Sequence, residues 1–444
     1  MRTLIYNCRL YINGKIIENC FILLDDCFIK DFGIENGVKV SYDAKYNAKG
    51  RLILPGIIDA HVHLRDQMLS YKEDFKSGTA SAVLGGVTSV IDMPNNLPPT
   101  DDPAKLKDRI NLAKDKILVN VGFTCKPSID YVINRELIRQ GAIAFKAFVY
   151  EYIDDNINLG FLDKIMSAIA EMNKKLMLHC NIKASYKEVI NLVKRRNMAK
   201  LCKIEGYLTE RVLSLAAKHG TKIHICHVSC PVTLKTINQY KDLVDVTSEV
   251  TIHHLILNYD LVERIGPLAH VDPPLKSKYT AKTLFKLLRE GYIDIIVSDH
   301  APHALNEKCL SDPKPGFPNL QLMMPILLTQ VKKGNLLLSD VIERASRKPA
   351  LIFKLEKRGA IERGYYADLV EVDLKRKFKV KSDMLISKAK YTPFEGMTLI
   401  GLPIRTYVNG ICVNDDYMII GRGGEGMILT SEVSHYGAKS EASA

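Results

Sequence analysis

Short strand-like segments and turns occupy both ends of this chain of 444 residues, and near the C-terminal end apolar and polar residues alternate within them. Such a period of two is typical of half-buried β-strands. Residues 366–373 and 405–413 alternate in this way, and Asn-Gly pairs stand at positions 13–14, within the short run 10–17, and at 409–410. An Asn-Gly pair between two alternating runs predicts a tight hairpin turn. We therefore expect the two ends of the chain to pair in one small β-domain.

The middle of the chain instead alternates apolar runs of strand length with longer segments of helical periodicity. The expected strands cover residues 56–61, 87–92, 118–123, 142–148, 175–179, 222–226, 245–250 and 294–298. The expected helices cover residues 71–84, 103–114, 162–173, 208–219 and 279–289. This order predicts an α/β fold with a (β/α)8 TIM-like barrel. The alternative is a doubly wound open sheet, which would place its ligand at one switch point rather than collect polar residues from many strand ends.

These two patterns divide the chain into four parts. Residues 1–52 and 358–425 are expected to form a composite β-sandwich from both termini, and residues 53–357 are expected to form the barrel. Residues 426–444 are rich in Gly, Ser and Ala, which predicts a flexible tail.

Residues that bind metals stand where the apolar runs of the barrel end. His61 and His63 follow the run 51–58, and because side chains alternate along a strand they point the same way, about 6–7 Å apart. Taken alone, a His-x-His motif fits one core histidine and one solvated histidine equally well. However, His179, His227 and Asp299 also close apolar runs. Active-site residues collect at the carboxyl ends of the strands of a parallel barrel, so the sequence predicts a metal site there.

Composition narrows the class of protein. The chain is 47% hydrophobic and 25% charged, which is ordinary for a soluble globular protein. No apolar run is long enough to span a membrane, and the N-terminus has no signal-peptide pattern, so we expect a cytoplasmic protein. The net charge of +12 is spread along the chain, which argues against a nucleic-acid site. The ten cysteines form no CxxC pair, so we expect no disulfide framework and mostly reduced, buried thiols.

Over essentially its whole length the chain resembles the dihydroorotases, which are cyclic amidohydrolases of the amidohydrolase superfamily. That resemblance implies a zinc-bearing (β/α)8 barrel with a composite β-sandwich. His61 and His63 match the ligands of the more buried zinc, and His179 and His227 match those of the more exposed zinc. Lys146 matches a lysine that is N6-carboxylated and bridges the two metals. Some family members bridge with an aspartate or hold one metal, so the metal count stays open.

Asp299 matches the family's catalytic residue, which binds metal and also carries the proton. Arg65, Asn95 and His303 match positions that hold the α-carboxylate of the substrate. The chemistry agrees, because a guanidinium fork fits a carboxylate with two hydrogen bonds. The implied reaction is the reversible cyclisation of N-carbamoyl-L-aspartate to (S)-dihydroorotate in pyrimidine biosynthesis. One departure lies after Arg65, where residues 66–68 lack the Pro-Gly of the family.

Two other functions compete with this interpretation. The first is a related cyclic-amide hydrolase of the hydantoinase or allantoinase type, which shares the metal motif but has no need of the carboxylate-binding residues. The second is a catalytically inactive scaffold homologue. Such homologues have lost metal ligands, whereas this chain has a suitable residue at every metal-ligand position. The expected partner is the small-molecule substrate, with neither nucleic acid nor membrane. The sequence leaves open whether the chain forms a homo-oligomer or associates with aspartate carbamoyltransferase.

Overall fold

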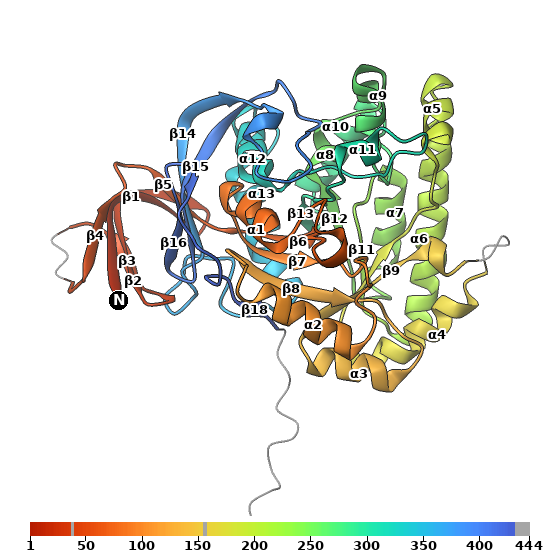
Figure 1. The fold of residues 1–444 in the computed structure, drawn as a ribbon, viewed down its shortest axis with the longest axis horizontal. Helices are drawn as coiled ribbons and strands as arrows, with labels where there is room; N and C mark the ends of the chain where they lie inside the picture. Colours follow the sequence, from red (N-terminus) through yellow and green to blue (C-terminus); the bar gives the residue numbers. More distant parts are fainter. Residues whose placement is uncertain (37–39, 154–157, 431–444) are drawn as a thin grey trace, which may run out of the picture.

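The computed structural model describes residues 1–36, 40–153 and 158–430. Two sheets lie next to each other, one built from both ends of the chain and one from its middle (Figure 1). The order of strands and helices in the middle is that of a (β/α)8 barrel, so the fold predicted from the sequence is confirmed.

The strands of the barrel are all parallel and follow one another in sequence order. They are β6 (Ile57–Val62), β7 (Val87–Asp92), β8 (Asn120–Cys125), β9 (Ala142–Phe148), β10 (Leu176–His179), β11 (Ile223–Ile225), β12 (Val246–Thr251) and β13 (Ile295–Val297). Each lies within two residues of an expected strand. Nearly every residue in these strands is buried, because helices cover the outside of the barrel and side chains fill its inside.

The barrel closes where β13 approaches β6. The backbone N–H of His63 donates to the carbonyl of His300 over 2.8 Å, and Val62 pairs with His300 in a parallel bridge. The backbone N–H of Ser298 also lies 3.2 Å from each carboxylate oxygen of Asp59, so that this buried side chain links the two strands. As a result, the carboxyl ends of the first and last strands lie side by side.

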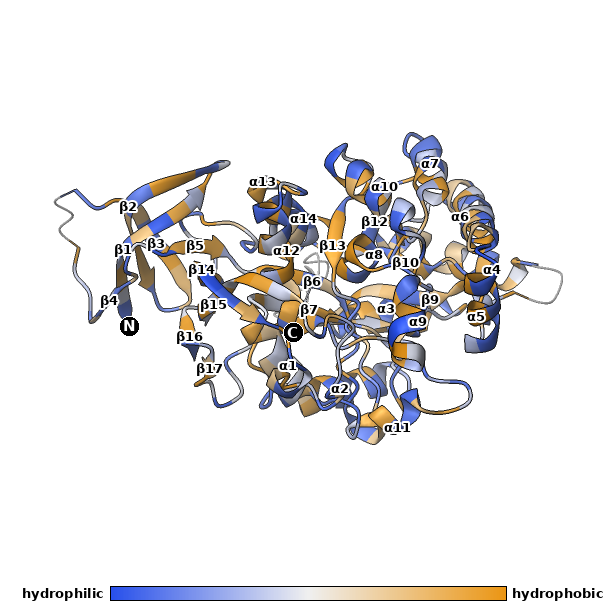
Figure 2. Ribbon diagram, turned by 90° about the horizontal axis from the view of Figure 1, so that it is seen from above, coloured by the Kyte–Doolittle hydropathy of each residue, from blue (hydrophilic) through white to orange (hydrophobic). Residues whose placement is uncertain are grey.

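The helices surround the barrel with their polar faces outward (Figure 2). They are α1 (Phe75–Leu84), α2 (Pro103–Ala113), α3 (Tyr131–Arg139), α4 (Gly160–Ile169), α5 (Tyr186–Lys194), α6 (Ala199–His219), α7 (Pro231–Tyr240), α8 (Ile252–Ile256), α9 (Asp260–Ile265), α10 (Lys278–Arg289), α11 (Leu305–Lys308), α12 (Met323–Lys332), α13 (Leu338–Ile342) and α14 (Lys348–Ile352). All five expected helices are present. The sequence analysis did not predict the other nine described helices, which are α3, α5, α7, α8, α9, α11, α12, α13 and α14. In α12 residues 323–330 are all buried, so it lacks the amphipathic period that marks a surface helix.

The second sheet joins the two ends of the chain. Its strands are β1 (Arg2–Ile12), β2 (Lys15–Asp25), β3 (Phe28–Ile34), β4 (Ala44–Asn47), β5 (Leu52–Pro55), β14 (Leu369–Lys379), β15 (Thr398–Val408), β16 (Ile411–Asp415) and β17 (Met418–Ile419). The N-terminal β5 pairs antiparallel with the C-terminal β14. Both predicted hairpins are confirmed, since Asn13 and Asn409 each adopt a positive φ, near 50°, before their glycines.

A hydrogen-bonded cluster connects this sheet to the barrel. Asn120, at the start of β8, donates to the Asp368 carboxylate over 3.2 Å and accepts from Asn409 over 2.8 Å. It also accepts the backbone N–H of Met427 over 3.0 Å, just before β18 (Ile428–Leu429) pairs in parallel with β8. Residues 426–430, expected to begin a tail, therefore lie against the barrel. The rest of that expected tail, 431–444, lies outside the described residues.

Two further expectations concern cysteines and membranes. Cys202 and Cys230 form a disulfide with their Cα atoms 5.4 Å apart, which corrects the expectation of reduced thiols at these two positions. Their separation of 28 residues follows no recognisable spacing, and only the packing of α6 beside the start of α7 brings them together. Among the described helices, none combines the length and apolarity that crossing a bilayer requires.

A buried ion pair holds the turn that follows β6. Arg109 in α2 and Asp92 at the end of β7 are each 1% exposed. Arg109 donates two hydrogen bonds to the same Asp92 oxygen over 2.9 and 2.6 Å, and a third to the carbonyl of Arg65 over 2.9 Å. The other Asp92 oxygen accepts the N–H of Leu64 over 2.8 Å. Because both partners contact the chain just after His63, the pair fixes its backbone.

Replacing Arg109 by Met should therefore destabilise the protein strongly, because Asp92 would remain buried without a cation. Loss of one partner of a buried pair costs about 3–5 kcal/mol. Chemical denaturation of both proteins measures this change in the free energy of unfolding. As a control, Arg139→Met removes an exposed pair with Glu136 and should leave the unfolding midpoint nearly unchanged. Equal midpoints for both variants would contradict the structural role of Arg109.

Candidate metal centre

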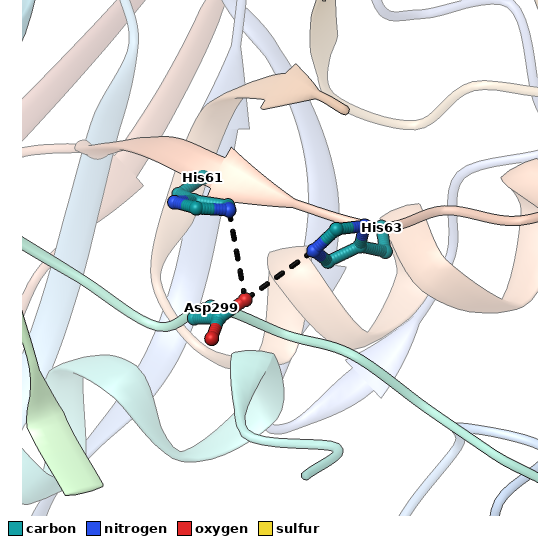
Figure 3. Close-up of side chains that lie close together, drawn as sticks. All are labelled: His61, His63 and Asp299. Atoms are coloured by element: carbon teal, nitrogen blue, oxygen red, sulfur yellow. Dashed lines mark ion pairs between the residues drawn. The ribbon is translucent and has the colours of Figure 1, made fainter. Parts of the chain in front are cut away.

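Two histidines and one aspartate meet where the barrel closes. His61 lies on β6, His63 follows that strand, and Asp299 follows β13. One Asp299 oxygen lies 3.7 Å from His61 Nε2 and 3.3 Å from His63 Nε2 (Figure 3). The three ligand atoms all lie within 4.8 Å of one another, and all three side chains are buried. Imidazole nitrogens and a carboxylate oxygen are ligands that zinc accepts, so this group can hold a metal ion.

Two more histidines face the same space. His179 ends β10 and His227 follows β11, with their ring centres 4.4 Å apart and the His227 ring 5.3 Å from that of His61. His179 Nε2 and His227 Nδ1 are buried and have no hydrogen-bond partner among the described residues. A buried polar atom without a partner is costly, and a bound ion is one common explanation.

The charge state of these rings suits a metal. Burial lowers the pKa of His63, His179 and His227 well below 6.5. Nearby positive charges act in the same direction, and Lys146 is one of them for all three rings. The imidazoles are therefore neutral at pH 7 and keep a lone pair for coordination.

Lys146 occupies a more deeply buried position on β9 than the other expected ligands. Its side chain is fully buried, with Nζ 2.9 Å from Cys226 Sγ and 5.2 Å from the centre of the Phe148 ring. A plain ammonium at this place would repel a metal cation, so Lys146 fits a metal centre only after its charge has been changed.

Glu249 on β12 is a residue of this centre that the sequence analysis missed. Its carboxylate accepts hydrogen bonds from His61 Nδ1, from His224 Nε2 over 3.0 Å and from the backbone N–H of His227 over 3.0 Å. Burial disfavours charge on both Glu249 and His61, but their opposite charges hold the pKa of Glu249 low and that of His61 high. Since Glu249 engages Nδ1, the Nε2 atom of His61 is left to face Asp299. The sequence does contain one sign of this role, because Glu249 is an acidic residue within a buried strand and therefore needs a partner there.

A cavity of about 210 Å³ opens above these residues. Every expected site residue except Lys146 contributes to its lining, together with residues that were not expected. The expected members are His61, His63, Arg65, Asn95, His179, His227, Asp299 and His303. The barrel therefore brings these side chains from the ends of five strands, β6, β7, β10, β11 and β13, into one small space.

Arg65 and His303 form a cationic corner of this cavity. Arg65 Nη2 lies 3.4 Å from His303 Nε2, and Arg65 Nε donates to the carbonyl of Pro302 over 3.3 Å. Burial lowers the pKa of His303 to about 3, helped by the charges of Arg65 and Lys72 and opposed by Glu307. His303 is thus neutral at pH 7, and the positive charge belongs to Arg65.

Asn95 lines the same cavity and contacts one of the histidines of the candidate metal centre. Its side-chain oxygen lies 2.6 Å from His63 Nδ1, so the amide accepts the proton of that ring and leaves Nε2 toward Asp299. Asp272 also lines the cavity, 3.5 Å from His179 Nε2, and its other oxygen has no hydrogen-bond partner among the described residues. The sequence analysis did not include Asp272, which lies in a loop without a regular pattern.

Known proteins share this architecture. The amidohydrolase family matches residues 52–413. A dihydroorotase of Methanothermobacter thermautotrophicus is 33% identical over 434 residues, covering 94% of this chain and 97% of that protein. A dihydroorotase of Pyrococcus furiosus is 35% identical over 419 residues, covering 92% and 94%. The solved L-hydantoinase (dihydropyrimidinase) of Arthrobacter aurescens has a TM-score of 0.87 and 28% identity, covering 96% of this chain and 99% of its own. The chain therefore belongs to the amidohydrolase family, and it is a cyclic amidohydrolase with metal-binding histidine and aspartate groups.

Proposed function

We propose that this enzyme is a dihydroorotase, which interconverts N-carbamoyl-L-aspartate and (S)-dihydroorotate plus water in pyrimidine biosynthesis. The observation that carries the proposal is the cationic corner of Arg65 and His303, which shares one cavity with the histidine and aspartate groups. A carboxylate on the substrate distinguishes dihydroorotate from uncharged cyclic amides. The identity to dihydroorotases over most of the chain supports the same substrate.

The centre fits two zinc ions, held by His61 and His63 on one side and by His179 and His227 on the other, with Asp299 as a further ligand. Neutral imidazoles and unpartnered buried nitrogens support this assignment. When bound, zinc lowers the pKa of a water molecule and polarises the amide carbonyl.

Lys146 would bridge the two ions as a carbamate. Its only hydrogen bond within the described residues goes to Cys226, and an ammonium buried without a carboxylate partner is costly. Addition of the neutral amine to CO₂ forms a C–N bond and releases one proton. The product is an anion with two oxygen ligands, which suits a position between two cations.

Asp299 is the proton carrier in this proposal. In the hydrolytic direction its carboxylate takes the proton of the attacking water and delivers it to the departing ring nitrogen. In the biosynthetic direction it removes the ureido proton. The short distances from the Asp299 carboxylate to His61 and His63 support this role, since a proton carrier has to lie within reach of the metal-bound water.

Arg65, His303 and Asn95 bind the carboxylate of the substrate, away from the reacting carbon. Since the oxygen of Asn95 already engages His63, its amide N–H groups remain to donate into the cavity. Three fixed donors hold the ring in one orientation, so their contribution to the reaction is positioning.

A hydantoinase is the second candidate, because the L-hydantoinase of Arthrobacter aurescens shares the fold over nearly the whole chain. A hydantoin ring lacks the carboxylate that the cationic corner would bind. Ring opening by the purified, zinc-loaded protein, followed with dihydroorotate, dihydrouracil and hydantoin, separates the two functions. Turnover of dihydroorotate alone supports the proposal, whereas turnover of only the uncharged rings would replace it with the second candidate.

Replacing Asp299 by Asn should leave zinc bound but lower kcat by about 10²–10⁴-fold, because the amide cannot accept the proton. Steady-state rates and metal analysis of the same sample test both statements. Asp260→Asn, at the exposed start of α9, serves as a control with unchanged rates. A metal-replete Asp299→Asn enzyme with a near-normal kcat would rule out proton transfer by this residue.

Arg65→Ala should mainly raise KM for dihydroorotate. A hydrogen bond to a charged group contributes about 1.5–3 kcal/mol, which corresponds to roughly 10-fold to 150-fold in affinity. The KM and kcat of the variant, measured beside the Arg139→Ala control, test this role. If dihydroorotate bound equally well to the variant, Arg65 would not be the carboxylate ligand.

Glu249→Gln should weaken zinc binding without unfolding the barrel. The amide keeps the size of the side chain but loses the charge that orients His61, and loss of such a partner lowers metal affinity about 10-fold to 100-fold. Competition with a chelator measures the affinity, and circular dichroism reports the fold. Glu136→Gln on the surface provides the control. Unchanged zinc affinity in a folded Glu249→Gln protein would show that His61 is oriented by other contacts.

A further inference from the structure

His303 is contacted by two cationic side chains, one at each ring nitrogen. Lys72 Nζ lies 3.2 Å from Nδ1, and Arg65 Nη2 lies 3.4 Å from Nε2. Lysine and arginine can only donate, whereas a neutral imidazole has one nitrogen that accepts and one that donates. One of the two contacts is therefore a hydrogen bond and the other brings two donors together.

The contact to Lys72 is the stronger candidate for the hydrogen bond. It is the shorter of the two, and the ammonium is held in place by Glu307, whose carboxylate lies 2.7 Å from Nζ. Tyr71 holds Glu307 in turn, donating its hydroxyl over 3.0 Å. The other Glu307 oxygen lies 3.5 Å from His303 Nδ1, too far to compete well for that nitrogen. Lys72 and His303 are both buried, so bulk solvent does not compete with Lys72 as the donor to Nδ1.

If Nδ1 accepts from Lys72, the ring proton must reside on Nε2. That N–H and the Arg65 guanidinium are then two donors at the cavity wall. Both can be satisfied by one carboxylate, which offers two oxygens. In the opposite tautomer Nε2 would present a lone pair, which accepts from Arg65 and repels a carboxylate.

We propose that Lys72, held by Glu307, is a positioning residue that fixes the Nε2–H tautomer of His303 and thereby prepares the site for a carboxylate. This inference rests on the proposed function. Lys72 does not belong to the cavity lining, so it acts through His303 and not by touching the substrate.

The test compares zinc-loaded wild-type enzyme with Lys72→Met, Lys72→Arg and the control Lys105→Met, which removes a surface lysine paired with Asp101. Lys72→Met should raise KM for dihydroorotate about 10-fold or more, while kcat changes less than about 3-fold. Lys72→Arg restores a donor and should recover most of the affinity. Lys105→Met should match the wild type. Equal KM values for Lys72→Met and Lys105→Met would overturn the proposal.

A second measurement reads the tautomer directly. Nitrogen-15 NMR of histidine-labelled wild-type protein, with the His303 signals identified from a His303→Gln sample, distinguishes Nε2–H from Nδ1–H. The proposal requires Nε2–H, and an Nδ1–H ring would overturn it even if Lys72→Met failed to fold. Failure of the proposed function has a different signature, because wild-type enzyme would then not open dihydroorotate while the tautomer could still be read.

Discussion

The structure depends most on the closure of the barrel between β6 and β13. Asp59 accepts the Ser298 N–H and the His63 N–H reaches the His300 carbonyl, so residues almost 240 positions apart become neighbours. The motif His61-Val-His63 can then meet Asp299. Without this contact between β6 and β13, the two histidines would lie at the end of a strand with no aspartate beside them. The buried pair Asp92–Arg109 also stabilises this contact, since Arg109 binds the backbone carbonyl of Arg65, directly after the histidine motif.

Near this contact, polar side chains orient the imidazole rings of the histidines. Glu249 and Asn95 each engage the Nδ1 atom of one histidine, His61 and His63, and so turn both Nε2 atoms toward Asp299. The His303 ring is contacted at both nitrogens by cations instead. The centre therefore combines histidines whose Nδ1 atoms are engaged by acceptors with a separate corner of donors. The proposed substrate, with a negative charge at one end and an amide at the other, would require such a division.

The sequence could predict the barrel strands because they are short, apolar and bounded by turns, and it could predict the histidines because they end such strands. Helix α12 was missed because it is buried on all sides, and its apolar residues show no period. Glu249 was missed because its role depends on His61 and His224, which lie far away in sequence. The disulfide between Cys202 and Cys230 was missed because only tertiary packing brings them together. Local pattern reveals which strands exist, whereas contacts between strands decide which polar residues matter.

The cluster at Asn120 has a consequence for how this molecule can move. The chain passes from the sheet to the barrel at Gly56. Asp368 and Asn409, which belong to the sheet side, form hydrogen bonds with Asn120 of the barrel, and the chain returns to the barrel through β18. A hinge between two bodies requires a crossing that can bend, but here several separate crossings are pinned by one buried hydrogen-bonded group. Rotation of the sheet against the barrel would break all of them together. We therefore expect the sheet and the barrel to move as one frame, so that any change in the shape of the cavity has to come from the loops that line it.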